Sequence, residues 1–245
     1  MSGSPPLTPG AGPGLGIDYF GRGHWLTSIQ TRLSLRARRR MFSRFRGFAG
    51  PLAGGTLLDV GATPDLERID SNCMLPWFRQ AGLAVSVWSR EDVRHLGRAF
   101  PFVTILPHVE AAGTIPVGDR AYDWVCASAV LEHVGSEHLQ VELLRECARI
   151  GDGLFITTPD RAHWLEFHTK LPFLHWLPRP FHRRLLKTLG QEFWASEENL
   201  NLVSGGDLAR AAARALGPKY RWVIRRVWAL GMPSNLVLLA RRLDS

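Results

Sequence analysis

The sequence is poor in cysteine and lacks any long apolar run, and both absences narrow the class of protein. Its three cysteines, Cys73, Cys126 and Cys147, form no CxxC pair, so we expect neither a disulfide framework nor a cysteine zinc site. No apolar run approaches the ~20 residues that a membrane-spanning helix needs. Residues 1–15 lack a basic region followed by a long apolar run, so a flexible tail is expected there instead of a secretory signal. These features together predict a protein of the reducing cytoplasm.

Acidic residues are absent from one basic segment, residues 26–48, although the whole chain has a net charge of +8. Apolar residues recur there at helical spacing, so residues 16–50 are expected to form a basic amphipathic helical extension. Two interpretations stay open. The helix packs on the domain with a solvated arginine face, or it lies on an anionic surface such as the inner membrane face, where each basic residue adds about 1 kcal/mol. The arginines of the segment are Arg32, Arg36, Arg38, Arg39, Arg40, Arg44 and Arg46.

From residue 51 onward, strand-like and helix-like segments alternate, which predicts an α/β, Rossmann-like open sheet covered on both faces. Strands are expected at 56–62, 83–89, 101–106, 121–131 and 151–159, and helices at 64–80, 90–100, 136–150 and 204–216. Ser136 is the expected N-cap of the third of these helices. Strands at 219–230 and 234–243 are joined by only three residues, so they must form a C-terminal antiparallel hairpin. We therefore assign residues 51–245 to one domain.

The loop after the first strand, in "TLLDVGATPD", lacks the later glycines of a phosphate-binding GxGxxG loop. "LLDVGA", "AYDWVCASAVLEHV" and the terminal hairpin together resemble a class I S-adenosylmethionine-dependent methyltransferase, with the closest likeness to the bacterial type 11 branch. The resemblance spans Thr56 to Leu243 and implies S-adenosylmethionine as the cofactor. Because this cofactor has no phosphates, it needs only a tight turn, a close backbone and a nearby carboxylate. Gly61, Ala62 and Asp59 are expected to supply them.

The remaining cofactor contacts are implied by the resemblance. The family usually has an acidic residue for the ribose hydroxyls at the end of the second strand, but Ser89 and Arg90 stand there, so Glu91 is expected to replace it, with Asp92 just beyond. The adenine contact is expected at Glu110 and Ala111, and Ser128 is expected to line the cleft. Asp123 is expected to lie away from the chemistry.

The acceptor side is expected to combine the "LEHV" loop with an insertion, residues 160–195, that forms an aromatic and histidine-rich lid. His133 is the first candidate for a general base, because imidazole titrates near neutral pH, whereas Glu132 is expected to be structural. The expected substrate-binding residues are Arg161, Trp164, Glu166, His168 and His175. No metal is expected, because the histidines form no HExxH pattern and have no cysteine partner.

The sequence thus predicts methyl transfer to a small-molecule acceptor or to one linked to a lipid or glycolipid. One alternative is an RNA methyltransferase, which the pI near 10.2 and the arginine helix favour. Against it, "SAVLEHV" occupies the place of the NPPY-like loop of base-amine methylation, and the paired cysteines of cytosine C5 methylation are absent. A second alternative is a non-catalytic binding protein that keeps the fold, which the missing acid at Ser89 favours.

Overall fold

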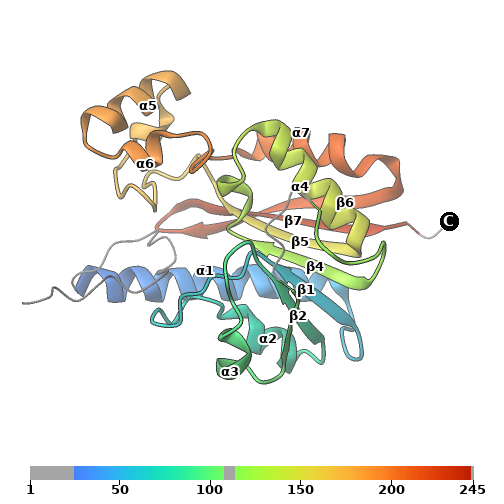
Figure 1. Ribbon diagram of the computed structural model, residues 1–245. Helices are drawn as coiled ribbons and strands as arrows, with labels where there is room; N and C mark the ends of the chain where they lie inside the picture. Colours follow the sequence, from blue (N-terminus) through green and yellow to red (C-terminus); the bar gives the residue numbers. More distant parts are fainter. Residues whose placement is uncertain (1–24, 108–113, 244–245) are drawn as a thin grey trace, which may run out of the picture.

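The computed structural model describes residues 25–107 and 114–243. A central sheet is covered on both faces by helices, and a small helical unit stands beyond the end of β5 (orange in Figure 1). The strands are β1 (Thr56–Val60), β2 (Ala84–Trp88), β3 (Val103–Ile105), β4 (Tyr122–Ser128), β5 (Gly151–Pro159), β6 (Tyr220–Ala229) and β7 (Met232–Arg242). The helices are α1 (Trp25–Ala49), α2 (Met74–Gln80), α3 (Leu96–Ala99), α4 (Glu137–Ile150), α5 (Arg179–Thr188), α6 (Glu192–Ala195) and α7 (Gly205–Leu216). Three short 3-10 turns are η1 (Leu131–His133), η2 (Leu174–Trp176) and η3 (Gly217–Lys219).

The seven-stranded sheet has the order β3-β2-β1-β4-β5-β7-β6. The first five strands are parallel, and β7 lies antiparallel between β5 and β6. This confirms the predicted open sheet with an antiparallel hairpin at its end. Strand order reverses between β1 and β4, and an open α/β sheet binds its ligands beyond the carboxyl ends of the strands at such a point.

The helix α1 belongs to the core of the domain. Its Phe45 is fully buried and stacks on Phe155 of β5 with ring centroids 4.7 Å apart. Phe45 also meets Trp124 of β4 edge to face, at 4.9 Å. Figure 1 shows α1 on the same face of the sheet as α2 and α3, while α4 and α7 cover the other face. The arginines at 32, 36, 39, 40, 44 and 46 remain exposed, so the structure has the packed helix with a solvated arginine face that the sequence left open.

Most predicted elements are confirmed within a few residues, including Ser136, whose hydroxyl accepts the N–H of Leu139 at the start of α4. The prediction of a helix over 90–100 was wrong for residues 90–95, because only Leu96–Ala99 is helical. The prediction of a helix over 64–80 was wrong for its first part, because only Met74–Gln80 is helical. Instead, residues 63–73 form a loop in which Asn72 adopts a positive φ of 52°. Short polar side chains that hydrogen-bond nearby backbone favour such turns over helix.

Some predictions fall outside the described residues. The tail of residues 1–15 and the proposed adenine contacts Glu110 and Ala111 are among them. Within the described part of the chain, none of the helices has the length and apolar character required to cross a bilayer.

Candidate active site at the carboxyl edge of the sheet

Gly61 follows β1 at the reversal of strand order, and two features require glycine there. Its φ is +83°, a conformation that other L-residues adopt only with strain. A Cβ at this position would lie 2.5 Å from Cγ2 of Val130, which follows β4. The missing side chain therefore lets the loops after β1 and β4 approach each other closely, and the N–H of Gly61 donates to the Trp88 carbonyl at 2.8 Å. Ala62 beside it is buried.

The loop after Gly61 is held by side chains that sequence reasoning missed. The side-chain oxygen of Asn72 accepts the N–H of Thr63 at 3.2 Å, and its amide nitrogen donates to the Thr63 carbonyl at 2.8 Å. His95, next to α3, donates from Nε2 to the carbonyl of Pro64 at 2.7 Å. These contacts fix a loop that lacks the later glycines of a GxGxxG motif. Asn72 lies in a turn with a positive φ, and the sequence alone does not indicate which backbone groups its side chain contacts.

Asp59, near the end of β1, is a buried carboxyl. Burial raises its pKa to about 7, against the opposing effects of a hydrogen bond from the Cys126 thiol and the charge of Arg38. Arg38 comes from α1, and its guanidinium donates to the hydroxyl of Ser128 at 3.3 Å. Ser128 in turn shares a hydrogen bond of 3.0 Å with Thr157 of β5. The structure therefore brings Asp59, Gly61 and Ser128 to the ends of the neighbouring strands β1 and β4 and adds Arg38 beside Ser128, while their role in cofactor binding stays a prediction.

Arg38 was not singled out from the sequence, although a signal was available. It lies three residues before Met41 and seven before Phe45, so it shares the face of α1 that points into the domain. The other arginines of the helix fall on the exposed face. An arginine at helical spacing from buried apolar residues points into the domain, whereas the other arginines of the helix face solvent. The spacing of Arg38 relative to Met41 and Phe45 can be seen in the sequence.

The end of β2 carries no acidic side chain. Ser89 is buried there, and its hydroxyl accepts the N–H of Glu91 at 3.2 Å. Asp92 is exposed and paired with Arg94, with the shortest contact at 2.6 Å, and hydrogen bonds from Arg94 hold the pKa of Asp92 below its usual range. Of the two acids, Glu91 therefore stays the candidate for the ribose. Asp123 lies at the other end of the sheet, where it accepts hydrogen bonds from the backbone and hydroxyl of Thr56.

Glu132 and His133 lie in η1, directly after β4. Glu132 is fully buried, and its Oε2 accepts the hydroxyl of Thr158 at 2.9 Å, whereas its Oε1 has no hydrogen-bond donor among the described residues. The Nδ1 of His133 lies 2.7 Å from the carbonyl of Asn199. A carbonyl only accepts, so Nδ1 carries the proton and Nε2 carries the lone pair of the neutral ring. Burial lowers the pKa of His133, against the charge of Glu132.

The insertion brings a second carboxyl and a second histidine to this place. Oε1 of Glu166 accepts the backbone N–H of His168 at 2.9 Å and its Nδ1–H at 2.7 Å, and Oε2 accepts the N–H of Thr169. Burial opposes ionisation of Glu166, but the hydrogen bonds and charge of His168 outweigh it and lower the pKa of Glu166 to about 2. The pKa of His168 is raised, because its bond to Glu166 outweighs burial.

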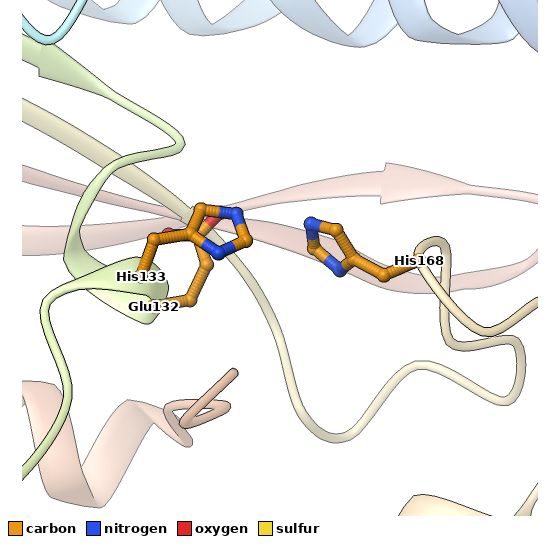
Figure 2. Close-up of side chains that lie close together, drawn as sticks. All are labelled: Glu132, His133 and His168. Carbon is orange, nitrogen blue, oxygen red and sulfur yellow. The ribbon is translucent and has the colours of Figure 1, made fainter. Parts of the chain in front are cut away.

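The two histidines meet across the end of the sheet. Their ring centroids are 4.8 Å apart with the planes at 84°, and Trp194 packs on His168 at 5.0 Å. Figure 2 shows a ring nitrogen of each histidine directed toward the other ring, with Glu132 beside His133. The structure therefore unites three of the predicted site residues, His133, Glu166 and His168, with Glu132, which the sequence analysis had assigned a structural role.

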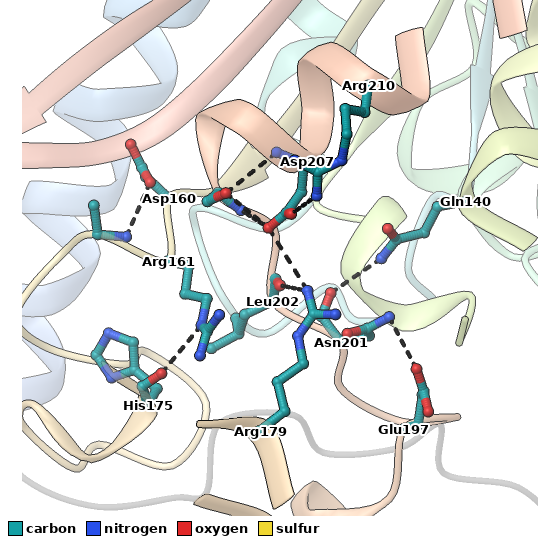
Figure 3. Close-up of polar contacts among 12 residues, drawn as sticks. Gln140, Asp160, Arg161, His175, Arg179, Glu197, Asn201, Leu202, Asp207 and Arg210 are labelled. Carbon is teal, nitrogen blue, oxygen red and sulfur yellow. Dashed lines mark hydrogen bonds and ion pairs between the residues drawn. The ribbon is translucent and has the colours of Figure 1, made fainter. Parts of the chain in front are cut away.

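Other predicted substrate-binding residues hold the insertion together. Arg161 donates to the carbonyl of His175 at 3.1 Å (Figure 3). It also donates to the carbonyl of Leu177 at 3.0 Å, and the Nε2 of His175 lies 2.6 Å from the carbonyl of His163. Trp164 packs on Phe173 with centroids 6.0 Å apart. The described contacts of Arg161 and His175 thus lie within the insertion and do not reach the cluster around His133.

A second polar network fixes the insertion to the domain (Figure 3). Arg179 donates to the Leu202 carbonyl and pairs with Asp207, which also forms the capping box of α7 with Ser204. Asn201 donates to the Gly135 carbonyl at 2.7 Å, and its own carbonyl accepts the side chain of Gln140. The segment after the insertion is therefore tied to the start of α4, close to η1.

An open cavity of about 700 Å³ lies elsewhere, between α1 and β6. Four of the residues that line it are arginines: Arg40, Arg44, Arg225 and Arg226. Because β6 is the edge strand and stands four places from β1, this cavity is separate from the switch point.

Comparison with known proteins supports the same fold. No family model matches the sequence, and no curated protein matches it significantly. Solved structures do match. One is magnesium protoporphyrin IX methyltransferase from Synechocystis PCC 6803 with bound SAH, at 13% identity and a TM-score of 0.55, covering 91% of this chain and 90% of that one. The chain has the class I methyltransferase fold.

Two further structures agree with this assignment. A SAM-dependent methyltransferase from Aquifex aeolicus is 14% identical with a TM-score of 0.54, covering 87% of this chain and 93% of that one. The 1,6-didemethyltoxoflavin-N1-methyltransferase of Burkholderia thailandensis, with bound 1,6-didemethyltoxoflavin and S-adenosylhomocysteine, is 14% identical with a TM-score of 0.54, covering 91% and 92%. The predicted fold is thus confirmed for almost the whole chain.

Proposed function

We propose that this protein transfers a methyl group from S-adenosylmethionine to a small-molecule acceptor. The observation that carries the proposal is the placement of the buried Asp59 and of Arg38, which donates to Ser128, at the switch point, on a fold that holds S-adenosylhomocysteine in similar proteins. The methionine end of the cofactor carries a carboxylate and an ammonium group. Arg38 fits the carboxylate, because a guanidinium forms strong charge-assisted hydrogen bonds with it, and Asp59 fits the ammonium.

The surrounding residues fit the rest of the cofactor. Gly61 keeps the loop close to the strands, Ser128 presents a hydroxyl at the end of β4, and Glu91 is the proposed ribose contact. When bound, S-adenosylmethionine supplies an electrophilic methyl group on a sulfonium. An ammonium group next to Asp59 would favour the ionised carboxylate, so cofactor binding lowers the pKa of Asp59 below about 7.

His133 is the proposed general base. Its Nδ1 proton is held by the Asn199 carbonyl, and burial keeps the ring neutral near pH 7, so its Nε2 accepts the proton that leaves an acceptor hydroxyl or amine. The ring is oriented by Asn199 and by packing against His168. Positioning of acceptor and methyl group supplies the rest of the rate enhancement.

The acceptor is proposed to lie beneath the insertion, against Trp194 and the ring of His168. Aromatic walls suit a planar, quinone-like or lipid-linked molecule. The exposed arginines of α1 and the arginine-lined cavity beside β6 support a further element of the proposal, association with an anionic membrane surface.

Calorimetric titration of the full-length protein with S-adenosylmethionine tests the proposal. We expect binding, and Arg38→Ala is expected to weaken it by about tenfold to a hundredfold, as for a lost charge-assisted hydrogen bond. Arg36→Ala is the matched control, because Arg36 lies two residues away on the exposed face of α1 and should leave the affinity unchanged. Absence of binding at millimolar cofactor, or equal losses in both variants, would contradict the proposal.

A further inference from the structure

We propose that Glu132, His133 and His168 form a binding site for a divalent transition-metal ion, with Zn²⁺ the first candidate. The three side chains each offer one ligand atom, and these atoms all lie within 4.8 Å of one another. Two imidazoles and one carboxylate form a recognised ligand set for zinc and for other first-row divalent ions, and it leaves coordination positions open for another ligand. The inference rests on the proposed methyltransferase function and deepens it, with one change: His133 becomes a metal ligand in place of the general base.

The buried carboxylate of Glu132 is the observation that most strongly indicates a cation site. Its side chain is fully buried, one oxygen is satisfied by Thr158, and the other has no donor among the described residues. A buried carboxylate oxygen without a partner is costly, and a cation is the natural partner for it. The same Oε1 lies 3.9 Å from the Nε2 of His133.

Both histidines have the orientation that metal ligands need. The Nδ1 of His133 faces the Asn199 carbonyl, and the Nδ1 of His168 faces the Glu166 carboxylate. Each contact places the ring proton on Nδ1, so the lone pair of the neutral ring lies on Nε2. A histidine that binds a metal usually donates its other N–H to a carboxylate or a carbonyl in this way. The structure thus supplies a supporting acceptor for each of the two rings.

Spacing and charge agree with an ion of this kind. Zinc bonds of 2.0–2.1 Å in a tetrahedral arrangement place ligand atoms about 3.3 Å apart, and the ligand atoms here lie within 4.8 Å of one another, so side-chain rotations that close the set by up to about 1.5 Å would complete the site. The cluster contains two buried carboxyls, Glu132 and Glu166, and a divalent cation with neutral imidazoles offsets both. Magnesium fits less well, because it prefers oxygen ligands.

The consequence for the proposed function is a narrower class of acceptor. An ion at this place would bind an acceptor through oxygen, as a hydroxyl or phenol does, and would orient it at the carboxyl edge of the sheet. His133 would then be a ligand and not the general base. This inference replaces the sequence-based expectation of no metal. That expectation rested on the absence of an HExxH pattern and of a cysteine partner, and the sequence does not show that residues 132–133 and residue 168 lie close together in the fold.

Metal binding by the full-length protein, stripped with a chelator, tests the inference. Zn²⁺ is titrated by calorimetry, and Co²⁺ is followed by its visible absorption, which reports low-symmetry nitrogen and oxygen ligation. We expect one equivalent to bind. Glu132→Gln keeps the shape of the side chain and His168→Asn is the second variant, and each should weaken Zn²⁺ binding by at least about 100-fold and abolish the Co²⁺ band, since even supporting residues account for 10- to 100-fold.

His138→Asn is the matched control, because its side chain is exposed on α4 and would report adventitious binding at the surface. It should leave both signals unchanged. The inference is overturned if the wild type binds no ion, or if Glu132→Gln and His168→Asn, shown to be folded by circular dichroism, bind it as tightly as the wild type. Titration with S-adenosylmethionine on the same samples separates the two proposals: cofactor binding without metal binding defeats only the metal site, and metal binding without cofactor binding defeats only the methyltransferase function.

Discussion

The carboxyl edge of the sheet has two sides that are built differently. The cofactor side, around Asp59 and Gly61, depends on backbone geometry and on one buried carboxyl. The acceptor side, around His133 and His168, depends on side-chain hydrogen bonds between segments far apart in the sequence. The first side follows from the strand order of the sheet, whereas the second exists only because the insertion folds back onto η1. Substitutions that act on one kind of support should therefore spare the other.

The largest effect is expected for the buried carboxyl of the cofactor side. The pKa of Asp59 is raised from an ordinary 3.8 to about 7, so between these values the folded protein holds a proton that the unfolded chain has lost. The free energy of unfolding therefore falls as the pH rises through this window, by roughly 4 kcal/mol at 1.36 kcal/mol per pKa unit, and levels off above it.

Asp59→Asn cannot ionise and should lack this contribution. Urea unfolding of both proteins from about pH 4 to about pH 8 measures it, because the variant keeps the pH dependence of every other group. Identical pH slopes in the two proteins would show that Asp59 does not titrate in this window.

The second effect concerns the backbone at Gly61. An alanine there would have a positive φ and a Cβ only 2.5 Å from Val130. We therefore expect Gly61→Ala to lower the free energy of unfolding by roughly 3 kcal/mol. About 1–2 kcal/mol of this comes from the backbone conformation, and the rest comes from overpacking against Val130. Gly54→Ala is a matched control, since Gly54 has a φ of +81° but nothing within 4 Å of its Cβ.

Gly54→Ala should lower the free energy of unfolding by only about 1–2 kcal/mol, because it carries the conformational cost without the overpacking. The difference between the two variants, measured by urea unfolding, isolates the close approach of the loops after β1 and β4. Equal losses would mean that the Val130 loop moves aside freely, and that the cofactor side is less rigid than its geometry indicates.

The same contrast explains how much the sequence revealed. Gly61, Asp59 and Ser128 could be placed together because strand ends at a switch point follow from topology, which alternating patterns predict. Asn72 and His95 could not, because their partners are backbone carbonyls in a loop that has no periodic pattern. The first part of the helix predicted at 64–80 was wrong for this reason, since apolar spacing says nothing about a turn held by one amide side chain.

On the acceptor side, the sequence identified residue types but not their contacts. The sequence predicted His133 as a general base and His168 as a substrate-binding residue. Nothing in their spacing indicated that their rings lie 4.8 Å apart. Arg161 and His175 were chosen on the same grounds, yet they hold the insertion together. Only the three-dimensional structure shows which of these residues meet at the edge of the sheet and which hold the insertion together.

The smallest effect is expected for Glu166→Gln, which tests the side-chain support of the acceptor side. The carboxylate accepts two N–H groups from His168 and one from Thr169, and an amide places an N–H donor against one of them. We expect a loss of about 2 kcal/mol in the free energy of unfolding, within the range for a buried donor left unsatisfied.

The matched control is Glu142→Gln, at an exposed carboxylate on α4, which should lower the free energy of unfolding by less than about 1 kcal/mol. Because Glu166 lies outside the cofactor side, affinity for S-adenosylmethionine should change by less than about twofold in either variant, and a larger loss in Glu166→Gln would show that the two sides are coupled through η1.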